Sequence, residues 1–233
     1  MLKCHLMKRI ATYILALVVL LAIASLIIVY APKHTLLTQS STAGSDLQMT
    51  VVQIHHSGTS YTVSAEYPQF GIPAIDAQIK KAVEDSVAEF EATPPAPQDS
   101  ASSHYEYTGN FDKVYVGPDV VSFELILSQY TGGAHNMTLY SGMNFDRGSG
   151  KRLLQDDAFK MIGLTVAQVS AGATDQLKAK LGDGFQFPEG ANTNPENFSS
   201  FVISAKNVAF IFQEYQVAAY AAGPQQVGFE RKR

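Results

Sequence analysis

The sequence predicts an α+β fold: an antiparallel sheet and packed helices form two small lobes, preceded by one N-terminal transmembrane helix. Three observations support this prediction: an uncharged run near the N-terminus, segments of β-strand character joined by short connections, and two segments with helical periodicity. Hairpin-length connections favour antiparallel pairing over a parallel α/β sheet. With 233 residues and 46% hydrophobic composition, the chain can bury one sizeable core or two small ones.

The uncharged run covers residues 10–30, IATYILALVVLLAIASLIIVY. As a helix rising about 1.5 Å per residue it would span roughly 31 Å, the thickness of a bilayer core. Basic residues precede it, so we expect residues 1–9 to be a cytoplasmic tail and the rest of this single-pass cell-membrane protein to be extracytoplasmic. A cleaved signal peptide ending near residues 22–24 is the alternative. Its apolar core would normally be only about 7–15 residues long, so we favour an uncleaved anchor.

The charge is unevenly divided by this span. Three of the 17 basic residues precede it, which leaves 14 basic residues with all 21 acidic ones and a net charge of −7 beyond the span. This excess disfavours nucleic acid and anionic lipid surfaces as partners and favours a basic one. The alternative is that mild acidity only aids solubility. The single cysteine, Cys4, precedes the span, so the exported part has neither a disulfide framework nor a thiolate zinc cluster.

The exported part is predicted to consist of a polar linker (31–49), an N-terminal α+β lobe (50–146) and a C-terminal α+β lobe (147–233). Helices are expected at 74–92, where apolar residues recur at steps of three and four, and at 164–181. Residues of β-branched and aromatic type predict the strands, which we place at 50–54, 61–67, 104–116, 120–130, 136–145, 201–203 and 208–212.

The sequence offers little for catalysis or metal binding. His55 and His56 are adjacent on a predicted strand and so point to opposite faces, and no helical pair of metal-binding histidines occurs. No Gly-x-Ser-x-Gly nucleophile elbow is present, although His135 could in principle activate Ser128 or Thr131. A pair of carboxylates acting on a glycan stays open. We therefore expect no metal, no cofactor and no enzymatic activity.

A recognition surface is the remaining candidate, built from aromatic and polar residues near the glycine-rich segments. Tyrosine offers contact area and a hydroxyl at small entropic cost, although strand tyrosines with one end in the core are the alternative interpretation. The candidate ligand-binding residues are Tyr130, Thr131, His135, Tyr140, Tyr215 and Tyr220. Gly132, Gly133 and Gly223 are interpreted as structural turn residues that adopt positive φ.

Three segments carry a resemblance to a known family: YPQFGIPAIDAQI (67–79), the segment 130–159 that begins YTGGAHNMTLYSGMNFD, and the segment 197–229 that contains YQVAAYAAGP. Together they resemble the RsiV/PdaC-type extracellular domains of unknown function, found in a lysozyme-sensing anti-sigma factor and beside a peptidoglycan deacetylase domain. A mycobacterial secreted immunogenic protein is also similar. The resemblance covers about residues 50 to 230 and implies an α+β fold with a second helix-and-strand lobe after the Gly-Gly-Ala-His hairpin.

The resemblance implies a membrane-anchored cell-envelope domain that binds or senses a ligand without catalysis, with lysozyme or a peptidoglycan fragment as partner. Two alternatives stay open: a small envelope glycan-acting hydrolase or deacetylase-associated domain, and a structural or immunogenic envelope protein. The chain departs from the anti-sigma pattern because only nine residues precede the span, too few to fold around a sigma factor.

The anchor can be tested with Val19→Arg, which puts a charge near the middle of the uncharged run. We expect this change to cost roughly 2.5–3.5 kcal/mol of insertion free energy. The protein should then be partly extracted from membranes by alkaline carbonate, whereas the wild type stays. Mature wild-type protein beginning near Ser25 in the medium would contradict an uncleaved anchor.

Overall fold

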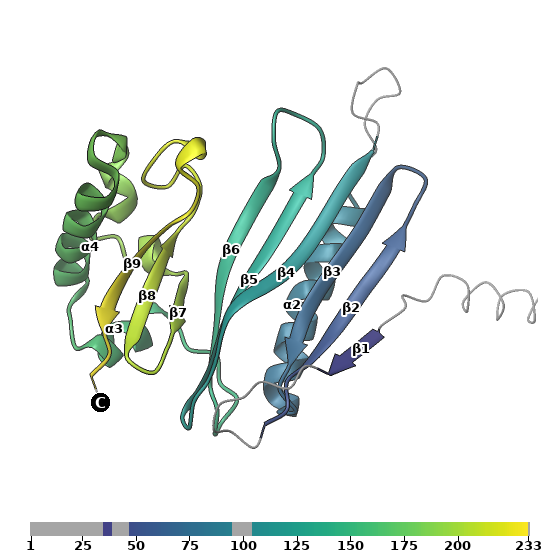
Figure 1. The fold of residues 1–233 in the computed structure, drawn as a ribbon, viewed down its shortest axis with the longest axis horizontal. Coiled ribbons are helices and arrows are strands. Elements are labelled where there is room, and N and C mark those ends of the chain that lie inside the picture. Colours follow the sequence, from purple (N-terminus) through teal and green to yellow (C-terminus); the bar gives the residue numbers. More distant parts are fainter. Residues whose placement is uncertain (1–34, 39–46, 95–103, 233) are drawn as a thin grey trace, which may run out of the picture. The chain divides into compact units, whose positions relative to one another are not determined.

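The computed structural model describes residues 35–38, 47–94 and 104–232 (Figure 1). The predicted cytoplasmic tail and transmembrane span lie outside these residues. Within the described residues, no helix has the length and apolar character needed to cross a membrane. The described chain is α+β, with one sheet of six strands and another of three.

The larger sheet contains six strands in sequence order, which are β1 (Thr35–Thr38), β2 (Thr50–Ser57), β3 (Tyr61–Gln69), β4 (Tyr105–Val116), β5 (Val120–Tyr130) and β6 (Met137–Asp146). β1 falls inside the predicted linker, 31–49, and pairs antiparallel with β2. The predicted linker is therefore not free of secondary structure.

The predicted all-antiparallel pairing is wrong at one place: β3 and β4 run parallel. The connection between them contains helix α2 (Pro73–Glu91). The helix is long enough to return the chain to the end of the sheet where β3 begins, so that β4 can run in the same direction as β3. The helix begins with Pro73, whose fixed φ suits the first turn. Its buried face contacts the sheet through the apolar residues that predicted it: Ile75, Ile79, Val83, Val87 and Phe90.

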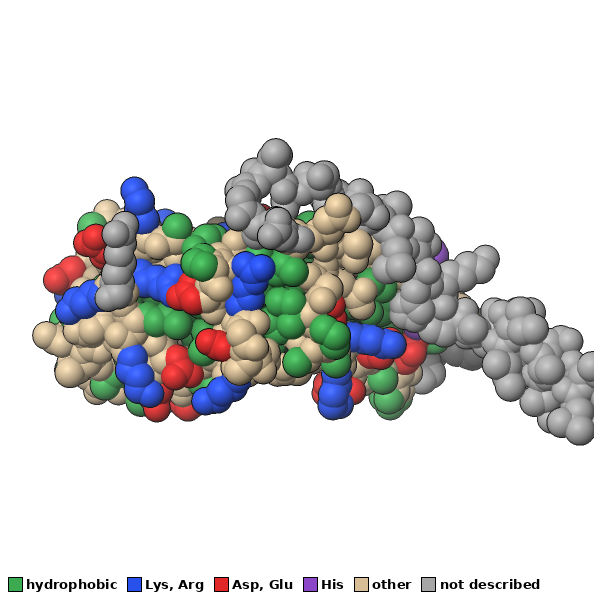
Figure 2. All heavy atoms as spheres, turned by 90° about the horizontal axis from the view of Figure 1, so that it is seen from below, with side chains coloured by type: hydrophobic (Ala, Val, Ile, Leu, Met, Phe, Trp, Pro, Cys, Tyr) green, Lys and Arg blue, Asp and Glu red, His purple; other side chains and the backbone are tan. Residues whose placement is uncertain are grey.

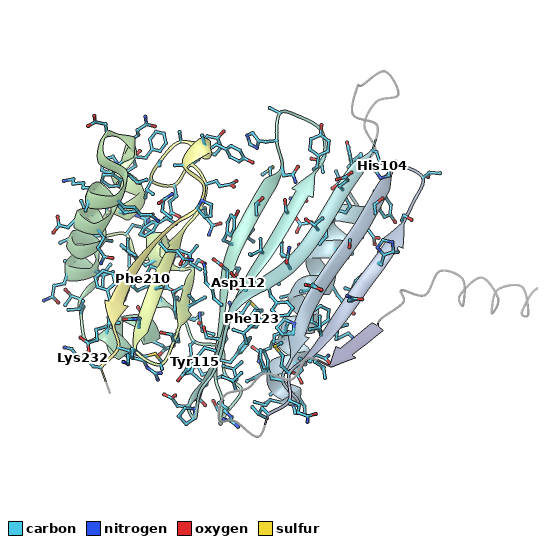
Figure 3. All side chains as sticks on the ribbon, viewed as in Figure 1. His104, Asp112, Tyr115, Phe123, Phe210 and Lys232 are labelled. Carbon is cyan, nitrogen blue, oxygen red and sulfur yellow. The ribbon has the colours of Figure 1, made fainter. Side chains whose placement is uncertain are left out.

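A bulge in β4 resolves a conflict between two acidic residues. Asp112 lies opposite Glu124 of β5, where like charges repel. The register shifts between Asp112 and Tyr115, which are labelled in Figure 3. In the bulge Lys113 adopts a φ of 55° and its Nζ lies 2.6 Å from Oε2 of Glu124, whose side chain is only 4% exposed. Gln226 of the smaller sheet donates to the other carboxylate oxygen at 3.2 Å. The buried carboxylate is thus paired.

The second lobe follows β6. It contains helices α3 (Gln155–Ile162) and α4 (Val166–Leu181), short 3-10 turns η1 (Gly182–Gly184), η2 (Pro188–Ala191), η3 (Pro195–Phe198) and η4 (Tyr220–Ala222), and the antiparallel strands β7 (Phe201–Ile203), β8 (Asn207–Phe212) and β9 (Gln225–Glu230). Neither α3 nor β9 was predicted: α3 has only 8 residues, and β9 shows weak alternation. Each lobe has its own aromatic core, represented by Phe123 and Phe210 in Figure 3.

The two sheets meet where β7 crosses β6, and Gly142 makes this contact possible. An ideal Cβ on Gly142 would overlap the backbone carbonyl of Phe201. The Gly142 N–H donates to Ser200 Oγ at 3.0 Å, and Ser200 Oγ in turn donates to the carbonyl of Tyr140 at 2.8 Å. Backbone therefore lies directly against backbone, a spacing that only glycine permits.

A buried polar pair secures the same contact. Ser122 and Asn144 are both 0% exposed, and Ser122 Oγ donates to Asn144 Oδ1 at 2.7 Å. Asn144 Nδ2 then donates to the carbonyl of Phe201 at 2.6 Å, while Ser122 Oγ accepts from the N–H of Ile203 at 2.8 Å. Each buried polar group has a partner across the contact between the sheets, so separating the lobes would leave them unsatisfied.

Replacing Gly142 with alanine should destabilise the protein by about 1–3 kcal/mol or more, because the new methyl group meets backbone that cannot rotate away. Gly228→Ala in β9 is the matched control, since a Cβ there meets nothing within 4 Å. Its effect should stay within about 0.5 kcal/mol. Urea unfolding measures both, and equal midpoints for the two variants would contradict the close approach.

Candidate functional site

A turn between β8 and η4, Gln213–Gln216, links the lobes beside β6. Gln213 exchanges two hydrogen bonds with the backbone of Tyr140: it accepts from the N–H at 2.9 Å and donates to the carbonyl at 2.7 Å. Gln216 donates through Nε2 to the carbonyls of Gly190 and Asn197 at 2.9 and 3.0 Å. The turn is therefore fixed on both sides.

Tyr215 is held at the outer point of this turn in an uncommon conformation. Its φ is 64°, in the left-handed region that non-glycine residues rarely adopt, and its side chain is 55% exposed. Such a conformation costs on the order of 1–3 kcal/mol and persists where the surroundings impose it. The bonds of Gln213 and Gln216 impose it here, and the result is an exposed aromatic ring.

Three of the predicted site residues form one ring cluster. The rings of His135 and Tyr220 stack with centroids 3.9 Å apart and planes at 19°, and Tyr215 lies 5.6 Å from Tyr220. His135 Nδ1 lies 2.8 Å from the carbonyl of Asn136, which can only accept, so this nitrogen carries a proton. In the neutral ring Nε2 then accepts from the Tyr215 hydroxyl, 3.3 Å away. The hairpin thus contacts the second lobe through stacked rings.

The other predicted residues lie around this cluster. Tyr130 ends β5 and its hydroxyl donates to the carbonyl of Gly133 at 3.3 Å. Thr131 follows at the start of the hairpin loop and is half-buried. The predicted turn glycines all have positive φ: 94° at Gly132, 118° at Gly133 and 65° at Gly223. Their role is to turn the chain.

Two ionisable groups near the cluster have shifted pKa values. Partial burial raises the pKa of Glu214, and the nearby charge of His135 opposes that rise. Burial also raises the pKa of Tyr140, with further contributions from the charges of Glu214, Glu124 and Tyr220. The surroundings therefore favour a protonated carboxyl at Glu214 more than water does.

A groove of about 410 Å³ lies between the C-terminal end of α2 and strands β4, β5 and β6, and Gln213 of the turn that carries Tyr215 lines it. Its lining combines apolar side chains with amides, hydroxyls and one carboxylate: Ser86, Glu89, Thr93, Tyr107, Leu127, Gln129, Met137, Thr138, Leu139 and Gln213. Met137 is 67% exposed and Leu139 is 53% exposed, on the same face of β6 as the buried Met143. An apolar floor with polar groups around it is a common form of ligand site.

The groove was not predicted from the sequence. Met137 and Leu139 alternate like core residues, so their pattern alone indicates burial. They are exposed because α2 packs mainly on β3 and β4 rather than on β6. Gln213 gave no signal either, because its role depends on a strand 73 residues away.

Histidine chemistry is sparse in the described residues. His56 lies on the α2 side of β2 with its Nδ1 2.8 Å from Oε1 of Glu91, whereas the adjacent His55 is exposed, as expected for opposite faces of a strand. Among residues 35–38, 47–94 and 104–232 there is no group of three His, Cys, Asp or Glu side chains placed to hold a metal ion.

On the face drawn in Figure 2, basic and acidic side chains are interspersed.

The fold is a two-lobed α+β domain with an open groove on its larger sheet. Residues 54–138 match the family model described as deacetylase PdaC, and residues 155–232 match the one described as a protein of unknown function, DUF3298. A curated relative, the peptidoglycan-N-acetylmuramic acid deacetylase PdaC of Bacillus subtilis, is 25% identical over 203 residues. The match covers 85% of this chain but only 44% of that protein. The chain belongs to the PdaC/DUF3298-type domain family.

One solved structure supports the fold. A DUF3298 family member from Bacteroides fragilis superposes with a TM-score of 0.53 at 16% identity, covering 79% of this chain and 90% of its own. A DUF3298 protein from Pseudomonas aeruginosa gives a TM-score of 0.48 at 18% identity, with coverages of 86% and 94%.

The prediction that the chain has no enzymatic role is contradicted by these matches. Both the family model over residues 54–138 and the curated relative carry the name of a peptidoglycan deacetylase. The prediction failed because it relied on recognisable catalytic motifs within the sequence, whereas the match to the deacetylase extends over 203 residues at 25% identity.

The raised pKa of Glu214 gives a prediction for stability against pH. When folding raises the pKa of an acid, the free energy of unfolding falls as the pH rises from the unfolded-state pKa to the folded-state pKa. Above the folded-state pKa the whole loss of stability remains. Glu214→Gln should therefore be slightly more stable than the wild type at pH 7, and the difference should vanish near pH 3. Denaturant midpoints at both pH values test this. Glu106→Gln, which removes the same charge from exposed β4, is the control; an equal gain there would assign the effect to net charge.

Proposed function

We propose that this chain takes part in peptidoglycan deacetylation at the cell envelope, and that the groove beside β6 holds the peptidoglycan. The observation that carries the proposal is the groove itself, which has an open apolar floor of Leu127 and Leu139 within reach of hydrogen-bonding side chains. At about 410 Å³ it is large enough for a short saccharide or peptide segment.

The lining suits an acetylated glycan. The C–H faces of sugar rings and the methyl groups of acetamides can pack on leucine side chains, as apolar surface does generally. Gln129, Gln213 and Thr138 provide donors and acceptors for hydroxyl and amide groups. The rings of His135 and Tyr215, each two residues along the chain from a residue that lines the groove, would provide flat surfaces for a longer glycan.

The comparisons support the same proposal, because the deacetylase resembles this chain over 203 residues. The location belongs to the proposal as well: residues 10–30 would anchor the chain in the cell membrane, with the described domain outside. Lysozyme, a basic partner suggested by the family resemblance, stays a prediction of that resemblance and of the net charge of −7 beyond the span.

The test uses the full chain in detergent, sedimented with insoluble peptidoglycan. Leu139→Ser should weaken binding about tenfold, since full burial of a leucine contributes about 1.5–3 kcal/mol and a ligand would cover only the 53% that is exposed. Leu154→Ser is the matched control, because Leu154 is similarly exposed at 57% but lies outside the groove.

Acetate released in the same suspensions is measured alongside binding. Release that falls with Leu139→Ser in parallel with binding would link the groove to deacetylation. Equal sedimentation of the two variants would rule out the groove, and a chain that neither binds peptidoglycan nor raises acetate release would overturn the proposed function.

A further inference from the structure

The outer edge of β6 is covered by hydrogen bonds along most of its length. Because β6 pairs antiparallel with β5, every second residue directs its N–H and C=O away from β5. Tyr140 and Gly142 face outward in this way, and their N–H groups donate to Gln213 and Ser200. Their carbonyls accept from Gln213 and Ser200 at Tyr140, and from Arg152 at Gly142.

Thr138 is the next outward-facing residue toward the hairpin tip. Its hydroxyl lies 3.1 Å from that of Ser128, directly opposite on β5, a close approach typical of a non-hydrogen-bonded pair. This confirms that the Thr138 N–H and C=O point away from β5. In the described part of the chain, the second lobe makes no hydrogen bond to them. The groove that Thr138 and Gln213 both line occupies this position instead.

The surroundings of this open edge are apolar on one side and acidic nearby. Met137 and Leu139 flank Thr138 and expose their side chains to the groove. Glu89 lines the groove, Glu214 follows Gln213 along the chain, and none of the residues lining the groove is Lys or Arg. Charge complementarity therefore favours a ligand that carries a cation.

We propose that Thr138 pairs with a short extended peptide that carries an amine side chain, so that the peptide adds to β6 as a further strand. Strand addition uses an open N–H and C=O for affinity and neighbouring pockets for side-chain specificity. This inference rests on the proposed function and deepens it: the part of peptidoglycan held in the groove is its peptide. Short apolar side chains of the peptide would contact Met137 and Leu139, and its amine would lie near Glu89.

Because Thr138 lies on an edge strand, its outward N–H can be removed by a single substitution. Thr138→Pro removes the outward N–H, and proline is tolerated on edge strands where the N–H faces outward. Thr138→Val is its control, because valine keeps the N–H and removes only the hydroxyl. If the hydrogen bond contributes as such bonds usually do, Thr138→Pro should weaken peptide binding by up to about tenfold and Thr138→Val by less than about twofold. Glu89→Gln should weaken binding a few-fold without altering the backbone.

The ligands are peptides released from peptidoglycan by an amidase, the same peptides with acetylated amines, and the peptide-free glycan that remains. Binding to the full chain in detergent is measured by calorimetry, thermal unfolding verifies that each variant is folded, and sedimentation equilibrium gives the oligomeric state. We expect the unmodified peptides to bind, and both the acetylated peptides and the peptide-free glycan to bind more weakly.

Three outcomes overturn the inference while leaving the proposed function intact. In the first, peptide-free glycan binds as tightly as whole peptidoglycan. In the second, folded Thr138→Pro and Glu89→Gln both bind the peptides like the wild type. A dimer abolished by Thr138→Pro would assign the edge to a second copy of the chain and also overturns it. If neither peptide, glycan nor whole peptidoglycan binds, the proposed function fails as well.

Discussion

The contact between Gly142 and Phe201 is the constraint on which the two-lobed structure depends. Without a side chain at residue 142, the backbone of β7 can lie against β6, and the buried pair Ser122 and Asn144 then bonds the start of the second lobe. Because Ser122 and Asn144 each also have a hydrogen-bond partner across this contact, the lobes are bound into one unit of the described chain. The family matches end at residue 138 and resume at 155, so Gly142 and Asn144 lie between them, whereas Phe201 lies within the second match.

The same contact determines where a ligand can bind. Once β7 is seated, Gln213 reaches the backbone of Tyr140, and the turn that follows presents Tyr215 beside His135 and Tyr220. The covered part of the β6 edge ends there, and the open groove begins at Thr138. The candidate site is thus a boundary between a satisfied and an unsatisfied section of one strand.

Local features of this architecture could be predicted from the sequence, and features that depend on distant partners could not. The periodicity of 74–92 and the alternation of 120–130 predicted α2 and β5 closely, because each follows from one buried face. The parallel pairing of β3 and β4 escaped prediction, since it depends on the path of α2 rather than on either strand. At the site, the structure brings together the rings of His135, Tyr215 and Tyr220, which the sequence offered only as separate candidates, and their role in ligand binding stays a prediction. The sequence does not distinguish Gly142 from other strand glycines, because its close contact is with Phe201 of the second lobe. The alternation of Met137 and Leu139 indicates burial, although both side chains are exposed.

The covered edge of β6 also has a consequence for the order in which the chain is made. A nascent chain emerges from its N-terminus, so β6 is complete about seventy residues before the turn that covers its edge. At synthesis rates of roughly 5–20 residues per second, the larger sheet would wait on the order of 4–14 seconds with its edge bare. Bare strand edges pair with one another. Between Thr138 and the end of β6, residues 139–146, this edge carries neither proline nor lysine to discourage such pairing. The second lobe therefore protects the edge of β6 only after it has been synthesised and has folded. Until then the nascent chain is most exposed to misassembly through this edge.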